Sequence, residues 1–277
     1  MTGALLSRST PCALDPKIML KQKSGEVTLL VLTLNEVEGM KVIMPQIGRD
    51  WVDQIIIVDG GSTDGTIEWA KQNGYEVCVQ RRKGIRFAYF EVFPLVRGDF
   101  IVTFSPDGNC PAEAIPALVA DLRKGYDLVI GSRYLPGAGS DDDDALTSFG
   151  NWLFTRTVNL LYRARYTDVM VIMRGYRKAI VEELDLLNDK AYELPERIFG
   201  TVISWEPLMS VRAVKAGLKI HEIPVPEPAR IAGERKLHIW RWGGAYYLQF
   251  WLERVVWLGR GSSFSSAARY RVNRPRD

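Results

Sequence analysis

Acidic and amide side chains follow three apolar runs in the first part of the chain. Asn35 and Glu36 come after residues 27–33, Asp59 and Asp64 close and follow residues 54–58, and Asp107 and Asn109 follow residues 99–104. Carboxylate and amide groups bind ligands through charge and hydrogen bonds. Asp, Asn and Gly also favour turns, which would explain any one pair taken alone. Three such pairs, each at the end of an apolar run, favour a binding site.

The remaining composition limits the chemistry of such a site. His221 and His238 are the only histidines, which argues against a histidine-rich metal site and against a Ser-His-Asp triad. The chain has no Gly-Lys dipeptide, hence no Walker A loop, and no G-x-G-x-x-G segment follows an apolar run. Carboxylates, amides, lysines and arginines must therefore do the chemistry.

The elements that position these residues are predicted from periodicity. Apolar runs without alternation, at residues 27–33, 54–58, 76–80, 99–104 and 127–130, predict strands that are buried on both faces. Helical patterns at residues 64–72, 112–124 and 206–216 lie between or after them. This order predicts an α/β fold with a mostly parallel, doubly wound sheet. Ligands bind such sheets beyond the carboxyl ends of the strands, where the acidic pairs fall.

Residues 136–146, PGAGSDDDDAL, contain four consecutive aspartates and no hydrophobic period. Consecutive side chains point in different directions, so we predict an exposed, mobile loop rather than a cation site.

The C-terminal part is rich in aromatic residues. One predicted helical segment holds Trp240, Trp242, Tyr246, Tyr247, Phe250, Trp251 and Trp257. Gln249, Glu253 and Arg260 form a narrow polar stripe, and the charges at Glu253 and Arg254 argue against a membrane span. The helix either packs on the domain or lies in a membrane interface, where Trp and Tyr are favoured. The aromatic density and the nearby arginines favour the interface.

One large domain accounts for most of the 277 residues. We expect an irregular leader at residues 1–25, the α/β domain at 26–238, and the aromatic helix with a basic tail at 239–277. The net charge of +3 does not indicate nucleic acid. Three dispersed cysteines, no secretory signal and no long apolar run predict a cytoplasmic protein, peripheral at the inner membrane face if the helix binds lipid. A homo-oligomer is left open.

Ordered motifs make these expectations more specific. They are T-L-N-E at 33–36, V-D-G-G-S-T-D-G-T at 58–66, G-D-F-I-V-T-F-S-P-D-G-N-C-P at 98–111, G-S-R-Y at 131–134, E-P-L-M-S-V-R-A-V-K-A-G-L-K-I-H-E-I-P-V at 206–225 and G-E-R-K-L at 233–237. Over residues 27–237 the chain resembles the inverting, family 2 glycosyltransferases of GT-A fold, and among them the dolichol-phosphate mannosyltransferase-like group. The resemblance implies a Rossmann-like nucleotide-binding sheet. It also implies transfer from a GDP-mannose or UDP-glucose type of donor to a polyprenyl or dolichyl phosphate, with inversion.

The resemblance further implies a divalent cation, Mg²⁺ or Mn²⁺, at a D-x-D motif. Here the motif reads Ser105-Pro106-Asp107, so a hydroxyl replaces the first acid. Asp107 and Asn109 are the expected ligands, because both cations prefer oxygen donors. The missing acid predicts weaker binding of the cation, which would neutralise the leaving diphosphate.

For the nucleotide, the resemblance implies contacts from Leu34, Asn35, Glu36, Asp59, Lys83, Arg86, Ser105 and Pro106. Asn35 and Glu36 would lie near the ribose, and Asp59 would accept hydrogen bonds from the base. Lys83 and Arg86 would face the base or the diphosphate, and a solvated strand end is the alternative for both.

For the acceptor phosphate, the resemblance implies Arg133, Arg230 and Lys236, since guanidinium groups suit phosphate geometry. Arg133 has the aspartate loop as an alternative partner. A phosphate acceptor is already anionic and needs no general base. For a hydroxyl acceptor, Glu206 and Asp168 are the candidate catalytic bases. Glu206 also begins a predicted helix, where a carboxylate stabilises the helix dipole.

Other functions remain open. One is a glycosyltransferase of the same fold with a soluble hydroxyl acceptor, which dependence on a lipid phosphate would exclude. A nucleotidyltransferase is disfavoured, because Asn35 and Glu36 stand where that class has a glycine-rich, basic loop. A nucleotide-binding relative without activity, suggested by Ser105, would show no turnover.

Overall fold

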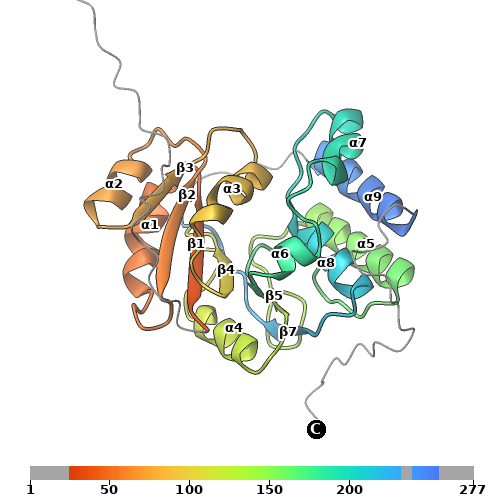
Figure 1. Cartoon of the computed structure of the whole chain (residues 1–277), viewed down its shortest axis with the longest axis horizontal. Coiled ribbons are helices and arrows are strands. Elements are labelled where there is room, and N and C mark those ends of the chain that lie inside the picture. The colour runs from red at the N-terminus through yellow and green to blue at the C-terminus, as the bar shows by residue number, and fades with distance from the viewer. Residues whose placement is uncertain (1–24, 232–238, 256–277) are drawn as a thin grey trace, which may run out of the picture.

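The computed structural model describes residues 25–231 and 239–255. Within them, a seven-stranded sheet runs in the order β3-β2-β1-β4-β6-β5-β7 (Figure 1). Its strands are β1 (Val27–Thr33), β2 (Gln54–Asp59), β3 (Glu76–Val79), β4 (Phe100–Phe104), β5 (Leu128–Ser132), β6 (Arg174–Arg177) and β7 (Ile220–Pro224). All paired strands are parallel except β6, which is antiparallel to β4 and β5. The predicted α/β fold with a mostly parallel sheet is confirmed.

The strand register brings the predicted site residues to one edge of the sheet. β1 is buried along its whole length, as its unbroken apolar run predicts. Thr33 pairs with Asp59, and Val31 pairs with Phe104. The turns that follow β1, β2 and β4 therefore open side by side.

Helices flank the sheet, and three of them gather at one side of the molecule (Figure 1). They are α1 (Val37–Ile43), α2 (Thr66–Gln72), α3 (Ile85–Val92), α4 (Ala114–Arg123), α5 (Ala145–Tyr162), α6 (Ile180–Glu183), α7 (Lys190–Phe199), α8 (Glu206–Lys215) and α9 (Ile239–Val255), with short 3-10 turns η1 (Met44–Gln46) and η2 (Phe93–Leu95). In Figure 1, α1 and α2 lie at the left, and α5, α7 and α9 gather at the right. The long helix α5 and the antiparallel strand β6 were not expected from the sequence.

The aromatic helix α9 packs on the domain with Gln249 and Glu253 of its predicted polar stripe turned inward, and Arg260 lies outside the described residues. Glu253 forms two bonds, of 2.7 and 3.1 Å, with the buried guanidinium of Arg212 on α8. Gln249 is also buried and donates to the carbonyl of Ala191 at 3.2 Å. Trp240 remains 80% exposed. The helix thus covers core with one face and leaves aromatic surface outside.

No helix among the described residues is long and apolar enough to cross a membrane. The predicted leader lies outside the described residues except for Gly25, as do the predicted basic tail from residue 256 onward and the segment 232–238 with Lys236.

Candidate active site

The turns after β1 and β2 form one cross-linked platform. The backbone N–H of Asn35 donates to the Ser62 hydroxyl at 2.7 Å, and the Asn35 side chain accepts from the N–H of Thr63 at 2.8 Å. Asn35 has a positive φ of 55°, a conformation that Asn tolerates well. The N–H of Glu36 donates to Thr66 at 3.0 Å. Leu34 is partly exposed beside this platform.

Asp59 organises the platform from within. Its carboxylate is fully buried and accepts from the backbone N–H groups of Gly61 and Ser62 at 2.8 and 2.7 Å. It also accepts from the hydroxyls of Thr33 and Ser62 at 2.8 and 2.6 Å. These four bonds satisfy its acceptor positions, so in this structure Asp59 shapes the turn. Its contact with a nucleotide base stays a prediction.

The turn after β4 carries the altered D-x-D motif. Gly108 has φ of 97°, and the backbone N–H of Asn109 donates back to Asp107 Oδ1 at 3.1 Å. A Cβ at Gly39 would lie 2.2 Å from the Pro106 carbonyl oxygen, so this glycine lets α1 press against the motif. Asp107 Oδ2 lies 3.0 Å from Nη1 of Arg230. The structure therefore brings together Asp107, Asn109 and Arg230, three predicted site residues.

The aspartate loop is bonded to the site. Most of residues 136–146 are exposed, as predicted, but Asp142 and Asp143 are partly buried, and the mobility of the loop stays a prediction. Asp142 accepts from Asn109 Nδ2 at 3.1 Å, and its Oδ2 lies 3.5 Å from Nε of Arg230. Asp143 accepts from the Tyr134 hydroxyl. Asp144 caps α5 by accepting from the N–H of Thr147 at 2.7 Å.

Arg133 and Asp168, predicted as an acceptor ligand and a base, form an ion pair with each other. Arg133 Nε and Nη2 donate to the two carboxylate oxygens of Asp168 at 2.7 and 3.1 Å. Glu227 adds a second carboxylate at 3.3 Å from Nη1. Asp168 is fully buried, so its negative charge depends on this guanidinium.

Glu222 holds the backbone next to this ion pair. Its carboxylate accepts from the backbone N–H of Thr167 at 2.8 Å and from that of Asp168 at 3.0 Å. Burial raises the pKa of Glu222 to about 7, and the neighbouring charge of Asp168 acts in the same direction.

Glu206, the other candidate base, lies inside the protein. Its side chain is 0% exposed and accepts from the hydroxyl of Tyr89, which stacks on Trp205 with 4.4 Å between ring centroids. Glu206 Oε2 has no hydrogen-bond partner among the described residues. In this structure an acceptor has no access to Glu206, and we assign the residue a structural role at the start of α8.

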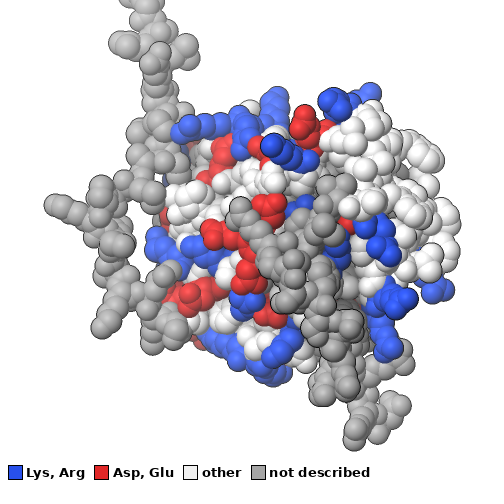
Figure 2. Space-filling model, turned by 45° about the vertical axis from the view of Figure 1, so that its right-hand side comes forward, with Lys and Arg blue, Asp and Glu red and all other residues white. Residues whose placement is uncertain are grey.

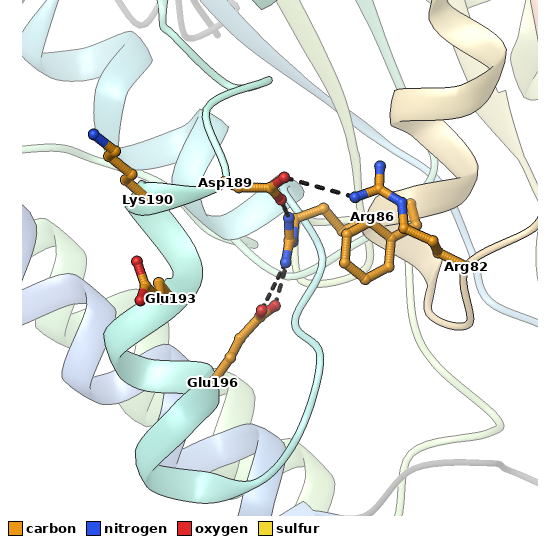
Figure 3. Close-up of a pocket in the computed structure, with 7 residues that line it drawn as sticks. Arg82, Arg86, Asp189, Lys190, Glu193 and Glu196 are labelled. Atoms are coloured by element: carbon orange, nitrogen blue, oxygen red, sulfur yellow. Dashed lines mark hydrogen bonds and ion pairs between the residues drawn. The ribbon is translucent and has the colours of Figure 1, made fainter.

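Arg86 and Lys83, both predicted to contact the nucleotide, lie in different surroundings: Arg86 is buried and Lys83 is exposed. The Arg86 guanidinium is buried, pairs with Glu196 of α7 at 2.6 Å and also pairs with Asp189. Figure 3 shows Asp189 between Arg86 and Arg82, at a small pocket beside α7. Arg86 thus ties α3 to α7, so the alternative of a solvated strand end is wrong for it, and its contact with the nucleotide stays a prediction. Lys83 is exposed on the preceding turn, and its role stays a prediction.

The oxygen donors after β4 fit a hard divalent cation. Asn109 is buried, and its Oδ1 has no hydrogen-bond partner among the described residues. A carboxylate and an amide oxygen on one turn are ligands that Mg²⁺ and Mn²⁺ accept. The described residues contain no group of three or more His, Cys, Asp or Glu placed to hold a metal ion. Any cation here would also rely on phosphate oxygens and water.

Comparisons with known proteins show what the chain is similar to. Residues 49–185 match the family described as Glycosyl transferase family 2. The undecaprenyl-phosphate mannosyltransferase of Micrococcus luteus is 28% identical over 240 residues, covering 78% of this chain and 93% of that protein. The polyprenol monophosphomannose synthase of Mycolicibacterium smegmatis is 28% identical over 233 residues, covering 76% and 80%.

A solved structure shares the fold. Glucosyl-3-phosphoglycerate synthase from Mycobacterium tuberculosis, solved with Mn²⁺, uridine diphosphate and glucosyl-3-phosphoglycerate, superimposes with a TM-score of 0.56 at 18% identity, covering 83% of this chain and 79% of that one. The fold is thus of the GT-A type. The class, that of the glycosyltransferases, follows from the family match and from the two relatives. The chain contains a Glycosyl transferase family 2 domain.

Sequence reasoning missed three carboxylates of the site. Glu222 lies on β7, within the segment 206–225 that served only for the resemblance, and Glu227 follows β7 outside every motif that was singled out. Asp142 belongs to the aspartate loop, whose run of four acids was a signal, although sequence alone did not tell which of them faces the motif.

Proposed function

We propose that the protein transfers a sugar from a GDP-mannose or UDP-glucose type of donor to a polyprenyl phosphate, with inversion and with help from Mg²⁺ or Mn²⁺. The names of the two mannosyltransferase relatives support a prenyl phosphate acceptor. The neighbour solved with Mn²⁺ and uridine diphosphate supports a nucleotide donor and a divalent cation. The platform after β1 and β2 would receive the nucleotide, and Asp107 with Asn109 would hold the cation near its diphosphate.

The observation that supports a phosphate acceptor over a hydroxyl acceptor is that neither candidate base is available. Glu206 is fully buried, and Asp168 is bound by Arg133 through two hydrogen bonds. A hydroxyl acceptor needs a base within hydrogen-bond reach, whereas a phosphate oxygen attacks without one. The cation, when bound, would neutralise charge on the leaving diphosphate. Arg230, at the edge of the site, would orient the acceptor phosphate.

We also propose that the protein works at a membrane surface, through the face formed by α5, α7 and α9. Large apolar side chains of these helices are exposed: Leu146, Phe149, Trp152, Leu160, Leu194, Ile198, Trp240, Trp251 and Val255. This side, at the right in Figure 1, is largely white with scattered blue in Figure 2. Exposed apolar side chains that gather on one side of a molecule favour an interaction site there.

The charges of α5 and α9 on this face fit anionic lipid. α5 contains no acidic residue, and the single acid of α9, Glu253, is buried against Arg212. Arg156, Arg241 and Arg254 are exposed. A helix that buries its polar stripe and exposes tryptophan and arginine suits the interface of an anionic bilayer.

A transfer assay tests the proposal. Purified protein is given GDP- or UDP-sugars with Mg²⁺ or Mn²⁺, and either a polyprenyl phosphate or a soluble acceptor such as phosphoglyceric acid. We expect transfer only with the lipid phosphate, and a product whose anomeric configuration, read by NMR, is inverted. Transfer to the soluble acceptor alone would contradict the polyprenyl phosphate acceptor. Nucleotide binding without any turnover would contradict an enzymatic role.

A further inference from the structure

The altered motif lacks one carboxylate, and another carboxylate lies beside the remaining ligands. Ser105 stands where the D-x-D pattern has its first acid. Asp142, 37 positions further along the chain by residue number, accepts from Asn109 Nδ2 at 3.1 Å. Its Oδ2 also lies 3.5 Å from Arg230 Nε, while Arg230 Nη1 lies 3.0 Å from Asp107 Oδ2. One guanidinium therefore joins Asp107 and Asp142.

The loop holds Asp142 in this place through its neighbours. The backbone N–H of Asp141 donates to the carbonyl of Glu227 at 2.8 Å. The N–H of Asp143 donates to the Ser140 hydroxyl at 3.0 Å, and Ser140 in turn donates to the Glu227 carboxylate. Asp144 begins α5 as its N-cap. The backbone on both sides of Asp142 is thus fixed.

An independent observation points to a ligand at this cluster. Asn109 is only 6% exposed, yet its Oδ1 has no hydrogen-bond partner among the described residues, while its Nδ2 is held by Asp142. A buried acceptor left without a partner is unfavourable, because it has lost its hydrogen bonds to water without replacement. A cation bound between the Asn109 amide and the carboxylates would satisfy it.

We propose that Asp142 is the second carboxylate of the divalent cation site, together with Asp107 and Asn109, and that it replaces the acid missing at Ser105. Arg230 balances the two carboxylates when no cation is present. Two neighbouring carboxylates repel one another unless a positive charge lies near both. Cation binding would release Arg230 from this duty and leave it available to the acceptor phosphate. This inference rests on the proposed function, because the nucleotide-sugar donor proposed there supplies the diphosphate that would share the cation.

Direct Mn²⁺ binding tests the inference without relying on activity. Binding of Mn²⁺ to the full chain is measured by electron paramagnetic resonance, alone and with UDP or GDP, for wild type, Asp142→Asn, Asp107→Asn and Asp141→Asn. Asp141 is an exposed neighbour in the same loop and serves as the matched control. We expect at least a roughly tenfold loss of Mn²⁺ affinity for Asp142→Asn and Asp107→Asn, and none for Asp141→Asn.

Thermal midpoints of the same samples show whether each variant folds, and Asp142→Glu provides a charged second variant that should bind Mn²⁺ more tightly than Asp142→Asn. Wild-type affinity in Asp142→Asn, or no Mn²⁺ binding by the wild type, would overturn the inference. Metal-independent transfer to a lipid phosphate would then leave the proposed sugar transfer standing and remove only the divalent cation from it. Mn²⁺ binding that requires Asp142 in a protein without transferase activity would keep the cation site and reject the function.

Discussion

Among single residues, Arg133 is important for stability, because its guanidinium forms ion pairs with the fully buried Asp168 and with Glu227. Removing one partner of a buried ion pair typically costs about 3–5 kcal/mol, since the other charge stays behind uncompensated. We therefore expect Arg133→Gln to lower the free energy of unfolding by that order in urea titrations. The exposed Arg123→Gln should leave it nearly unchanged.

A double variant separates structure from binding at this position. Asp168→Asn added to Arg133→Gln removes both charges and should recover part of the lost stability. If Arg133→Gln instead keeps full stability and only raises the KM for the lipid phosphate, the guanidinium is mainly an acceptor ligand.

Glu222 predicts a pH dependence of stability. Its folded pKa is raised to about 7 by burial, so the protonated form is favoured in the folded protein. The stabilising contribution is complete below the unfolded pKa near 4.5 and is lost as pH rises through about 7. The full loss is roughly 3 kcal/mol at most. Glu222→Gln, which keeps a carbonyl acceptor for Thr167 and Asp168, should lack this loss.

Unfolding measured from pH 5 to pH 8 checks the sign. The free energy of Glu222→Gln minus that of wild type should rise with pH across this window. A difference that stays constant would show that Glu222 does not change its protonation on folding.

The meeting of three predicted site residues followed from the sequence, but the pairing of others did not. Asp107, Asn109 and Arg230 do meet, because strand ends and their following turns share one edge. The bond of Arg133 to Asp168, and the burial of Glu206, depend on contacts between distant parts of the chain. Residue type and local spacing carry no information on such contacts.

At the scale of elements, α9 approaches its neighbours closely at a pair of glycines. A Cβ at Gly244 would lie 2.2 Å from the Phe199 ring at the end of α7, whereas one at Gly243 would reach Phe154 at an ordinary 3.4 Å. Replacing Gly by Ala inside a helix gains about 1 kcal/mol where space allows, and overpacking typically costs 1–3 kcal/mol.

We therefore expect Gly243→Ala to stabilise the protein or leave it unchanged, and Gly244→Ala to destabilise it relative to Gly243→Ala by about 1–3 kcal/mol. Thermal or chemical unfolding of the two variants side by side gives the comparison, in which the propensity change is the same. Equal stability would mean that α7 and α9 pack less tightly than the structure shows.

Buried parallel strands were predicted well, because β1, β2 and β4 are apolar without alternation. β6 was missed, since its four residues R-G-Y-R look polar. Arg174 is nevertheless buried there, because it donates to the carbonyls of Val171 and Glu206 at 3.0 Å each. Hydrogen bonds from a buried guanidinium to backbone carbonyls leave no local pattern in the sequence, so they could not be predicted.

At the scale of the whole molecule, the site edge and the apolar face belong to connected elements. α5 begins at Ala145, next to its N-cap Asp144 in the loop that touches Asn109, and its exposed Phe149 and Trp152 lie on the proposed lipid face. A lipid acceptor presented at that face would have its phosphate near the first turn of α5. The net charge of +3 gave no hint of this arrangement, since it does not tell where arginines and acids lie.

The proposed lipid face predicts binding to anionic vesicles that depends on aromatic side chains. Wild-type protein should sediment with vesicles of equal phosphatidylglycerol and phosphatidylcholine, and less with phosphatidylcholine alone. Trp240→Ser with Trp251→Ser should weaken binding to both by about tenfold or more, because two large apolar groups no longer enter the interface. Arg241→Gln with Arg254→Gln should weaken binding to the anionic vesicles only, and added salt should do the same.

Val42→Ser, an exposed apolar residue on α1 at the opposite side of the molecule, is the matched control and should bind as wild type does. Transfer to a short, water-soluble prenyl phosphate should persist in the tryptophan variant, because these side chains dock the protein and do not hold the donor. Sedimentation of the tryptophan variant equal to that of wild type would contradict the lipid face. Loss of transfer to the soluble acceptor would place the two tryptophans at the active site instead.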